Sequence, residues 1–367
     1  MKGIIKKVLV AIDWIFLKIQ GFVISFFKKE YLPFVMRHVC KAAETKSTYV
    51  AYQIKPKDTT EIPILSGLEQ SHSFAIVLQG PICMKDNMTY NTVKFYKQTY
   101  PHAVIIVSTW NDEPAENATR LTEQGAIIVR SEKPAHNGFM NVNYQLTNSL
   151  AGVEKAKELG CEFAVKTRTD QRVCKPFIFD AMLSSINMFP SVSEKQRGRV
   201  VTLGACGGMF IPYYISDFMY LGYTEDLIKL FSIPYDSRAD DTNIKKLGCL
   251  SRCQISEQLI PPEVYILKHY CNDVLGLHYG NTLAAYWDVV KKCLICYGMN
   301  DIDLMWNKYD DTFYNSSWYV PAYKADSIDS LYSMYLDFFT WLNLYTGNLK
   351  YDPCYEKYTN VPFHSNK

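Results

Sequence analysis

Three charged side chains stand at alternate positions directly after a short apolar run, and their types suit phosphate and metal chemistry. The run is 163–165, and Lys166, Arg168 and Asp170 follow it. A carboxylate there could hold Mg²⁺ or Mn²⁺, because Mg²⁺ typically uses one or two protein carboxylates together with phosphate oxygens and water. Lys166 and Arg168 could bind a phosphate directly, Arg168 through a two-pronged fork. The alternative is an ion pair between Arg168 and Asp170 at a strand end, and spacing alone does not separate the two.

Polar residues also follow two earlier apolar runs and open one helical segment. Gly80 permits a close approach of the backbone to a ligand, and the amide of Gln79 could read a base or a ribose. Ser108 and Thr109 could hydrogen-bond a ligand on which Trp110 stacks, and amides at a helix start favour anions. The alternatives are a plain turn, an N-cap run and helix-capping amides. The candidate binding residues are Gln79, Gly80, Pro81, Ser108, Thr109, Trp110, Asn141, Asn143, Gln145, Lys166 and Arg168.

Two acids near predicted helix starts could act as a general base. Asp217 and Glu263 could each accept the proton of an attacking hydroxyl group. The alternative for each is a charge that stabilises the N-terminus of its helix by about 0.3–1 kcal/mol. Asp240 and Asp241 are a further candidate pair, but they fit a solvated loop better.

Four apolar runs alternate with helical patterns and must position these residues. The runs are 74–78, 104–107, 126–129 and 163–165, and the helical segments between them are 89–99, 113–124 and 141–159. This alternation indicates a mostly parallel sheet that helices cover on both faces. Such sheets bind ligands outside the carboxyl ends of their strands, where the polar residues stand. Further helices are predicted at 177–188, 214–231 and 283–296, and another opens at 261–263 with proline in its first turn.

The N-terminal segment is apolar, flanked by lysines and predicted to be an amphipathic helix. A membrane span needs about 20 apolar residues with few or no charges, and Asp13 and Lys18 interrupt residues 8–27. The charged residues fall within about half of a helical wheel, and most large apolar residues fill the other half. Basic amphipathic helices of this kind tend to lie in a membrane interface. The alternative is a helix docked on the protein's own core.

Composition excludes some partners and leaves one metal question open. The net charge of +2 gives no support to a nucleic-acid partner, for which a basic patch is expected. The 11 cysteines are scattered and odd in number, which favours free thiols in a reducing compartment. Cys293 and Cys296 could contribute to a zinc site, but their apolar surroundings favour buried free cysteines.

Several of these segments, taken together, resemble the WavE lipopolysaccharide-synthesis family. The resemblance covers residues 74–270 and rests on the order and spacing of Leu78-Gln-Gly-Pro81, Val104-Ile-Ile-Val-Ser-Thr-Trp110, Asn141-x-Asn143-x-Gln145, Val165-Lys-Thr-Arg-Thr-Asp-Gln171, Ile215-Ser-Asp217 and Pro262-Glu263-x-Tyr265. It implies a GT-A-like fold and a glycosyltransferase of bacterial surface polysaccharide that uses a nucleotide-activated donor. GT-A enzymes place a metal-binding Asp-x-Asp after the fourth strand. Here the triplet is Arg168-Thr169-Asp170, so only the second Asp is present, and Arg168 could partly replace a cation.

The predicted organisation has four parts. They are an amphipathic membrane-associating segment (1–45), a linker (46–73), a GT-A-like catalytic domain (74–270) and a Tyr-rich, largely helical acceptor-side or lid region (271–367). The predicted function is transfer of a sugar from a nucleotide-sugar donor to a lipopolysaccharide or capsule acceptor. The enzyme would lie peripherally on the cytoplasmic face of the cell membrane, with Asp170 as metal ligand and Glu263 or Asp217 as base.

Two rival hypotheses remain at this point. One is an inactive nucleotide-sugar or glycan-binding scaffold at the membrane. The other is a sugar nucleotidyltransferase, which would need a Gly-rich loop bearing Arg and Lys after the first strand, where this chain has Gln79-Gly-Pro-Ile82.

Overall fold

The chain divides into two compact units, Met1–Pro56 and Lys57–Lys367. The computed structural model describes residues 2–26, 28–44, 46, 73–238, 250–278, 280–306 and 335–360. The predicted linker, 46–73, lies outside the described residues except at its two ends. Asp240 and Asp241 lie outside them as well.

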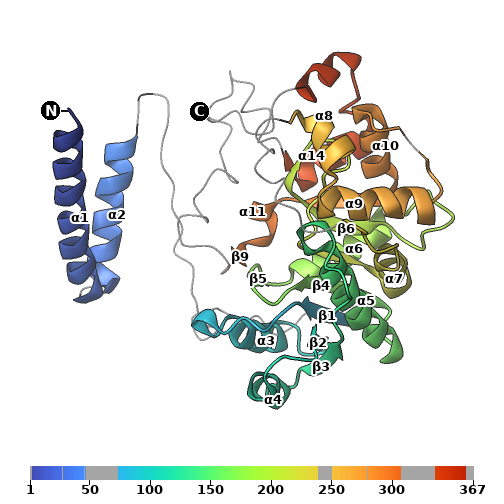
Figure 1. The fold of residues 1–367 in the computed structure, drawn as a ribbon, viewed down its shortest axis with the longest axis horizontal. Helices are drawn as coiled ribbons and strands as arrows, with labels where there is room; N and C mark the ends of the chain where they lie inside the picture. Colours follow the sequence, from blue (N-terminus) through green and yellow to red (C-terminus); the bar gives the residue numbers. More distant parts are fainter. Residues whose placement is uncertain are drawn as a thin grey trace. The chain divides into compact units, whose positions relative to one another are not determined.

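The first unit contains two helices, α1 (Lys2–Phe26) and α2 (Lys28–Ala43) (Figure 1). Large apolar side chains along α1 are exposed within this unit, among them Ile12, Ile15, Phe16, Ile19, Phe22 and Phe26. Over the described residues, no helix combines the length and the hydropathy that crossing a membrane requires. The N-terminal segment is helical, and its amphipathic, membrane-surface role stays a prediction.

The second unit is built around an eight-stranded sheet with the order β10-β6-β7-β4-β1-β2-β3, in which β8 also pairs with β6. β1 pairs in parallel with β2 and β4, and β2 pairs in parallel with β3. β7 runs antiparallel to both β4 and β6. The bounds are β1 (Phe74–Gln79), β2 (Val104–Trp110), β3 (Ile127–Ser131), β4 (Phe163–Arg168), β6 (Val200–Gly208), β7 (Tyr220–Tyr223), β8 (Leu294–Tyr297) and β10 (Tyr335–Leu336). The predicted mostly parallel sheet flanked by helices is confirmed.

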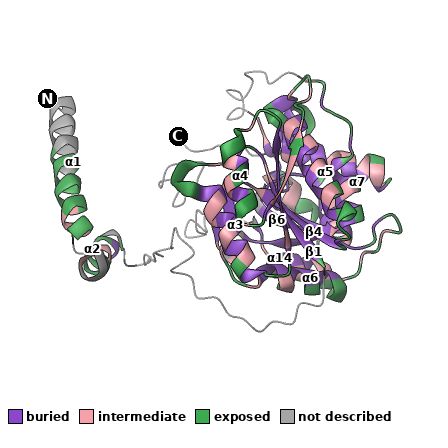
Figure 2. Ribbon diagram, turned by 90° about the horizontal axis from the view of Figure 1, so that it is seen from below, coloured by how far each residue is buried: buried purple, intermediate pink, exposed green. Residues whose placement is uncertain are grey.

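Helices cover both faces of the sheet (Figure 2). α5 and α7 pack against each other on one face. α3 and α6 meet on the other face, where the rings of Tyr100 and Phe179 lie 5.1 Å apart. The helices that the described residues of the second unit form are α3 (Met88–Thr99), α4 (Ala115–Glu123), α5 (Val142–Glu158), α6 (Ile178–Met188), α7 (Thr224–Phe231), α8 (Arg252–Gln254), α9 (Pro262–His269), α10 (Leu283–Cys293), α11 (Met299–Ile302) and α14 (Phe338–Thr346).

Short irregular segments complete the unit. Gln171–Val173 (β5) and Leu304–Trp306 (β9) form a separate two-stranded antiparallel sheet. Single turns of helix lie at η2 (Lys85–Asn87), η3 (Phe139–Asn141), η5 (Ile255–Leu259), η6 (Tyr270–Val274) and η9 (Pro353–Tyr358).

Two predicted helices are wrong over part of their length. Within 214–231, Tyr220–Tyr223 is the strand β7, and only Thr224–Phe231 is helical. β4 and β6 flank β7, so both of its edges find backbone partners, and this tertiary pairing overrides the helical pattern. The predicted helix at 283–296 ends at Cys293, because Leu294–Tyr297 pairs in parallel with β6.

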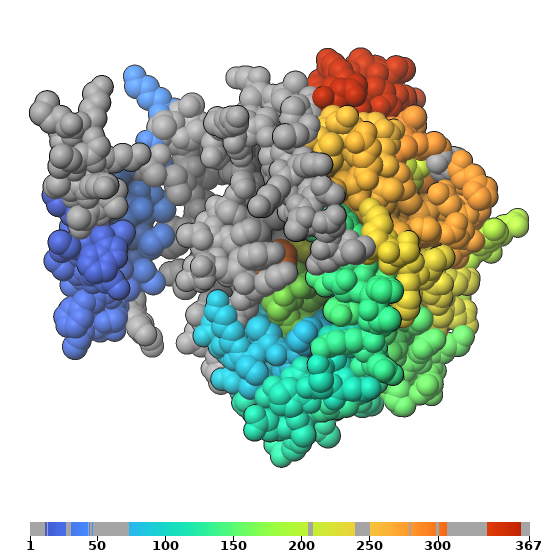
Figure 3. Space-filling model, viewed as in Figure 1, coloured from blue at the N-terminus to red at the C-terminus, as the bar shows by residue number. Residues whose placement is uncertain are grey.

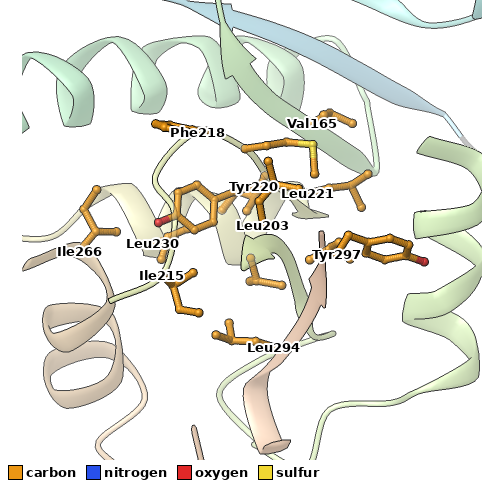
Figure 4. Packing of buried hydrophobic residues seen from close by; sticks show 14 of the residues in the cluster. Val165, Leu203, Ile215, Phe218, Tyr220, Leu221, Leu230, Ile266, Leu294 and Tyr297 are labelled. Carbon is orange, nitrogen blue, oxygen red and sulfur yellow. The ribbon is translucent and has the colours of Figure 1, made fainter. Parts of the chain in front are cut away.

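Close packing brings the elements of the second unit together. α5 approaches the sheet at Gly152, where an added Cβ would lie 2.3 Å from Cγ1 of Val77. Ile215, from the segment before β7, Leu230 of α7 and Ile266 of α9 belong to one buried cluster (Figure 4). Because Asp217 and Glu263 lie two and three residues from members of this cluster, the core fixes both acids relative to the sheet.

Candidate active site

The carboxyl ends of β1 and β4 lie side by side at the point where the strand order reverses. The chain runs from β1 outward to β2 and β3, and then returns to β4 on the other side of β1. Gln79, the last residue of β1, pairs with Arg168, the last residue of β4. Open α/β sheets bind ligands in the crevice that such a switch point opens. The sequence prediction assigned the binding residues to this edge.

Hydrogen bonds tie these two strand ends together. The backbone N–H of Thr169 donates to the carbonyl of Gln79 at 3.2 Å, and the Thr169 hydroxyl donates to the carbonyl of Pro81 at 2.5 Å. Gly80 has a φ of +120°, and a Cβ on it would lie 3.2 Å from the Thr169 hydroxyl oxygen. A side chain at position 80 would therefore strain the turn and crowd Thr169. Beside this turn, Oε1 of Gln79 is buried and lacks a hydrogen-bond partner among the described residues.

The residues after β2 are held by Glu113, whose role sequence reasoning missed. Its Oε2 accepts hydrogen bonds from the backbone N–H of Ile82 at 3.0 Å and from the Thr109 hydroxyl at 3.2 Å. One carboxylate thus joins the loop after β1 to the end of β2. The sequence showed only an acid at a helix start, since nothing in it reveals a partner 31 residues away. Ser108 and Thr109 are both fully buried.

Trp110 is also buried, and its ring packs edge-on against Tyr144 with the centroids 5.1 Å apart. In this structure it is part of the packing between β2 and α5. The predicted stacking of a ligand on this ring would require the contact with Tyr144 to open.

Two of the three amides at the start of α5 serve the fold. The Asn143 amide nitrogen donates to the carbonyls of His136 and Asp236, and its oxygen accepts from the backbone N–H of Asp236. Gln145 is buried and donates to the carbonyl of Asp217 at 3.0 Å. Asn141 is exposed, and its oxygen accepts from the side chain of Asn137. Asn143 and Gln145 therefore hold the segment at 217–236 against α5, which favours the alternative of a structural role.

Lys166 is turned inward. It is fully buried, and its ammonium group donates to the carbonyl of Asp217 at 2.7 Å. Burial lowers the pKa of Lys166 to about 7, against the opposing charge of Asp217. A direct contact between Lys166 and a diphosphate in the crevice would require this side chain to leave its buried partner.

Arg168 and Asp170 form the strand-end ion pair that the spacing allowed. Nε of Arg168 donates to Oδ1 of Asp170 at 2.9 Å, and Nη2 donates to Oδ2 at 3.0 Å. Their side chains are 23% and 17% exposed, so the pair is reachable from solvent yet partly desolvated. The indole N–H of Trp306 also donates to Oδ2 of Asp170 at 3.4 Å.

A divalent metal at Asp170 would have to share the carboxylate with the guanidinium group of Arg168. Asp170 is one carboxylate, and both of its oxygens already accept hydrogen bonds. Across the described residues there is no group of three or more His, Cys, Asp or Glu side chains arranged to hold a metal ion. A cation at Asp170 would lie beside the positive charge of Arg168, and the two charges would repel each other. Cys293 and Cys296 are buried free cysteines.

Glu263 and Asp217 come together near the end of β4. The Tyr214 hydroxyl donates to Oε1 of Glu263 at 3.4 Å, while Oε2 is buried and has no hydrogen-bond partner in the part of the chain that the structure describes. Burial, with the charge of Asp217 added, raises the pKa of Glu263 from 4.5 to about 8, and Arg168 acts in the opposite direction. A carboxylate with such a pKa is suited to accept a proton near neutral pH.

Segments that are distant in sequence adjoin on one face of the molecule, where residues 250–275 (yellow to orange) border residues 120–150 (green) (Figure 3). The guanidinium group of Arg238 stacks over the ring of Phe139 at 5.0 Å and contributes to this junction. The candidate site combines three groups. They are the cation Arg168 at the end of β4, the buried acceptor of Gln79 at the end of β1, and Glu263, whose carboxylate has a raised pKa. Such a site can bind an anionic ligand and deprotonate a hydroxyl group.

A family comparison identifies the class. Residues 74–366 match the model of the WavE lipopolysaccharide synthesis family, so the chain belongs to that family, as its sequence predicted. Membership supports the predicted class of enzyme, a glycosyltransferase. The match extends past residue 270, where the predicted resemblance ended, and includes most of the C-terminal region.

Comparisons with other proteins are more distant. No curated protein matches. Glucosyl-3-phosphoglycerate synthase from Mycobacterium tuberculosis, in complex with Mn²⁺, UDP and glucosyl-3-phosphoglycerate, is 13% identical over 68% of this chain and 76% of that chain, with a TM-score of 0.35. A putative glucose-1-phosphate thymidylyltransferase from Bacillus anthracis is 10% identical over 44% of this chain and 76% of that chain, with a TM-score of 0.28. Both likenesses are too remote to bear on activity.

Proposed function

We propose that this protein transfers a sugar from a nucleotide-sugar donor to a lipopolysaccharide acceptor. The observation that carries the proposal is Glu263, a partly exposed acid whose pKa of about 8 suits a general base, beside the switch point of the sheet. A scaffold that only binds has no need of a carboxylate with one buried oxygen that lacks a hydrogen-bond partner among the described residues, since such a group weakens the fold.

The donor would lie across the carboxyl ends of β1 and β4. Gln79 offers a buried acceptor for a base or ribose N–H or O–H group. Arg168 is partly exposed at the neighbouring strand end, and a guanidinium group matches the oxygens of a diphosphate. Negative charge grows on the leaving diphosphate as the glycosidic bond breaks, so a fixed cation there stabilises the transition state.

Glu263 would serve as the base of a single displacement with inversion. The acceptor hydroxyl oxygen forms a bond to the anomeric carbon, the bond from that carbon to the diphosphate breaks, and the hydroxyl proton passes to Glu263. Asp217 lies close enough to raise the pKa of Glu263 and so strengthens it as a base. General-base catalysis of this kind contributes about 10²–10⁴ in rate.

The test compares two variants that change the same kind of residue. Glu263 and Glu225 each lie in the first turn of a helix, but Glu225 is exposed on α7. Glu263→Gln is expected to lower turnover of a nucleotide sugar by about 10²–10⁴, and Glu225→Gln to leave it unchanged. Equal activity of Glu263→Gln and wild type would remove Glu263 from the mechanism.

A membrane surface is the proposed location, because the acceptor would be anchored in lipid. Support comes from α1, on which Ile15, Ile19 and Phe22 are 54%, 58% and 65% exposed, and from the lysines that flank the apolar segment. A helix of this composition places its apolar face at the boundary between headgroups and acyl chains, and its lysines attract anionic lipid.

Sedimentation with vesicles tests this location. The full chain is expected to sediment with vesicles of mixed zwitterionic and anionic phospholipid, and Ile19→Asp is expected to abolish sedimentation. Gln20→Glu adds the same charge at the next position, toward the polar side, and is expected to retain it. Sedimentation of all three proteins, or of none, would contradict the proposal.

A further inference from the structure

The fork between Arg168 and Asp170 lies where the proposed function places a diphosphate. We propose that Arg168, oriented by Asp170, is the cation that receives this diphosphate, so that nucleotide binding requires no divalent metal. The inference rests on the proposed function, because it concerns the same site. It makes Asp170 a positioning residue rather than a metal ligand.

The geometry of the pair supports a fixed guanidinium group. Two parallel hydrogen bonds of 2.9 and 3.0 Å hold Arg168 in the plane of the Asp170 carboxylate. The Trp306 ring lies 5.9 Å from the guanidinium carbon, and its N–H donates to the same carboxylate. Trp306 itself packs against Phe218 with the ring centroids 4.5 Å apart. An arginine held in this way has lost most of its rotamer freedom before a ligand arrives.

The pair with Asp170 does not exclude a bond to phosphate. The bonds to the Asp170 carboxylate come from Nε and Nη2, and a guanidinium group bound in this way keeps its full positive charge. Because arginine stays charged at all relevant pH values, its charge does not depend on a neighbour. Lys166 is placed differently. It is fully buried, and its ammonium group donates to a backbone carbonyl.

Asp170 offers a metal ion little in the same arrangement. Each of its oxygens accepts a charge-assisted hydrogen bond from Arg168, so a metal ion there would add a second positive charge beside the guanidinium group. The described residues supply no cluster of further His, Cys, Asp or Glu ligands to compensate for the repulsion between the two charges. The carboxylate is thus matched to its arginine.

Calorimetry on the unmodified full chain tests the inference first. The dissociation constants of UDP, GDP and dTDP are measured once with excess EDTA and once with excess Mn²⁺ or Mg²⁺. The nucleotide that binds is expected to do so with values that agree within about threefold. A metal that tightens binding by about tenfold or more would overturn the inference and leave the proposed function standing. Failure of all three nucleotides to bind under either condition would overturn both.

Substitutions then separate positioning from metal ligation. Arg168→Gln is expected to weaken binding by at least about tenfold in EDTA, and Asp170→Asn by a smaller factor that is the same with and without metal. In the Arg168→Gln background, Asp170→Asn is expected to add nothing, because Asp170 acts through Arg168. An effect of Asp170→Asn that vanishes in EDTA would make Asp170 a metal ligand.

A matched control lies at the opposite end of β4. Arg197 also pairs with a carboxylate, that of Glu162, which directly precedes the first residue of β4. Arg197→Gln removes the same charge from the same kind of pair, so it is expected to leave nucleotide affinity unchanged. An equal loss in Arg197→Gln and Arg168→Gln would reduce the effect to general electrostatics and overturn the inference. Circular dichroism verifies the fold of each variant. The calorimetry with and without metal uses the unmodified chain and does not depend on any variant.

Discussion

Glu263 makes stability depend on pH in a way that a single substitution removes. Its pKa is about 8 in the folded chain and 4.5 without the fold. Between these values the folded state binds more protons than the unfolded state, so the free energy of unfolding falls as pH rises. Below pH 4.5 both states are protonated and the penalty is absent, and above pH 8 it is fully present. The difference, 8 − 4.5, corresponds to about 5 kcal/mol at about 1.4 kcal/mol per pKa unit.

Glu263→Gln keeps the shape of the side chain and removes the titration. The variant is expected to gain stability over wild type by about 1.4 kcal/mol per pH unit, which amounts to about 3 kcal/mol between about pH 5.5 and 7.5. Urea unfolding of both proteins at several pH values measures this difference. Glu225→Gln, at an exposed helix start, is expected to follow wild type at every pH. A difference between wild type and Glu263→Gln that does not change with pH would refute the buried, charge-coupled carboxylate and the base derived from it.

Three further predictions follow from single contacts. Asp217→Asn is expected to shift the acid limb of kcat/KM to lower pH, because the charge of Asp217 raises the pKa of Glu263; a pH profile checks this. Asn143→Ala is expected to cost about 2–4 kcal/mol in urea unfolding, because the backbone N–H and carbonyl of Asp236 lose their partner, while nucleotide affinity is retained. Gly152→Ala is expected to cost about 1–3 kcal/mol, because its Cβ would overlap the core.

Controls and contrary outcomes sharpen these three. Gly280→Ala is the control for Gly152→Ala, since nothing lies within 4 Å of its Cβ position, and equal stability of the two variants would contradict the close approach of α5. Loss of nucleotide affinity in folded Asn143→Ala would restore the sequence prediction of a ligand contact. An acid limb that Asp217→Asn leaves unchanged would contradict the effect of Asp217 on the pKa of Glu263.

The parallel part of the sheet was predictable because its strands are continuous apolar runs in the sequence. Buried parallel strands need apolar residues on both faces, and the short sequences of β1, β2 and β4 are almost entirely apolar. β7 escaped prediction because Tyr220–Tyr223 is short and its identity depends on pairing with β4 and β6. Partners that are distant in sequence leave no local pattern.

The candidate site was predictable in its position and less so in its roles. Polar residues after strands mark the carboxyl edge, and Arg168 and Asp170 meet there. The residue types do not reveal that the side chains of Lys166 and Asn143 donate to backbone carbonyls. These bonds depend on how the segment at 217–236 folds over both residues. The hydrogen bond between Glu113 and the backbone N–H of Ile82 was missed for the same reason.

The central claim is sugar transfer, and product analysis tests it most directly. The full chain is incubated with UDP-, GDP- and dTDP-activated sugars and with a truncated lipopolysaccharide, and both products are followed by mass spectrometry. The account predicts that one donor releases its nucleotide while the acceptor gains one sugar residue in equal amount. A protein that binds a nucleotide sugar and yields neither product would contradict the account and leave a binding scaffold.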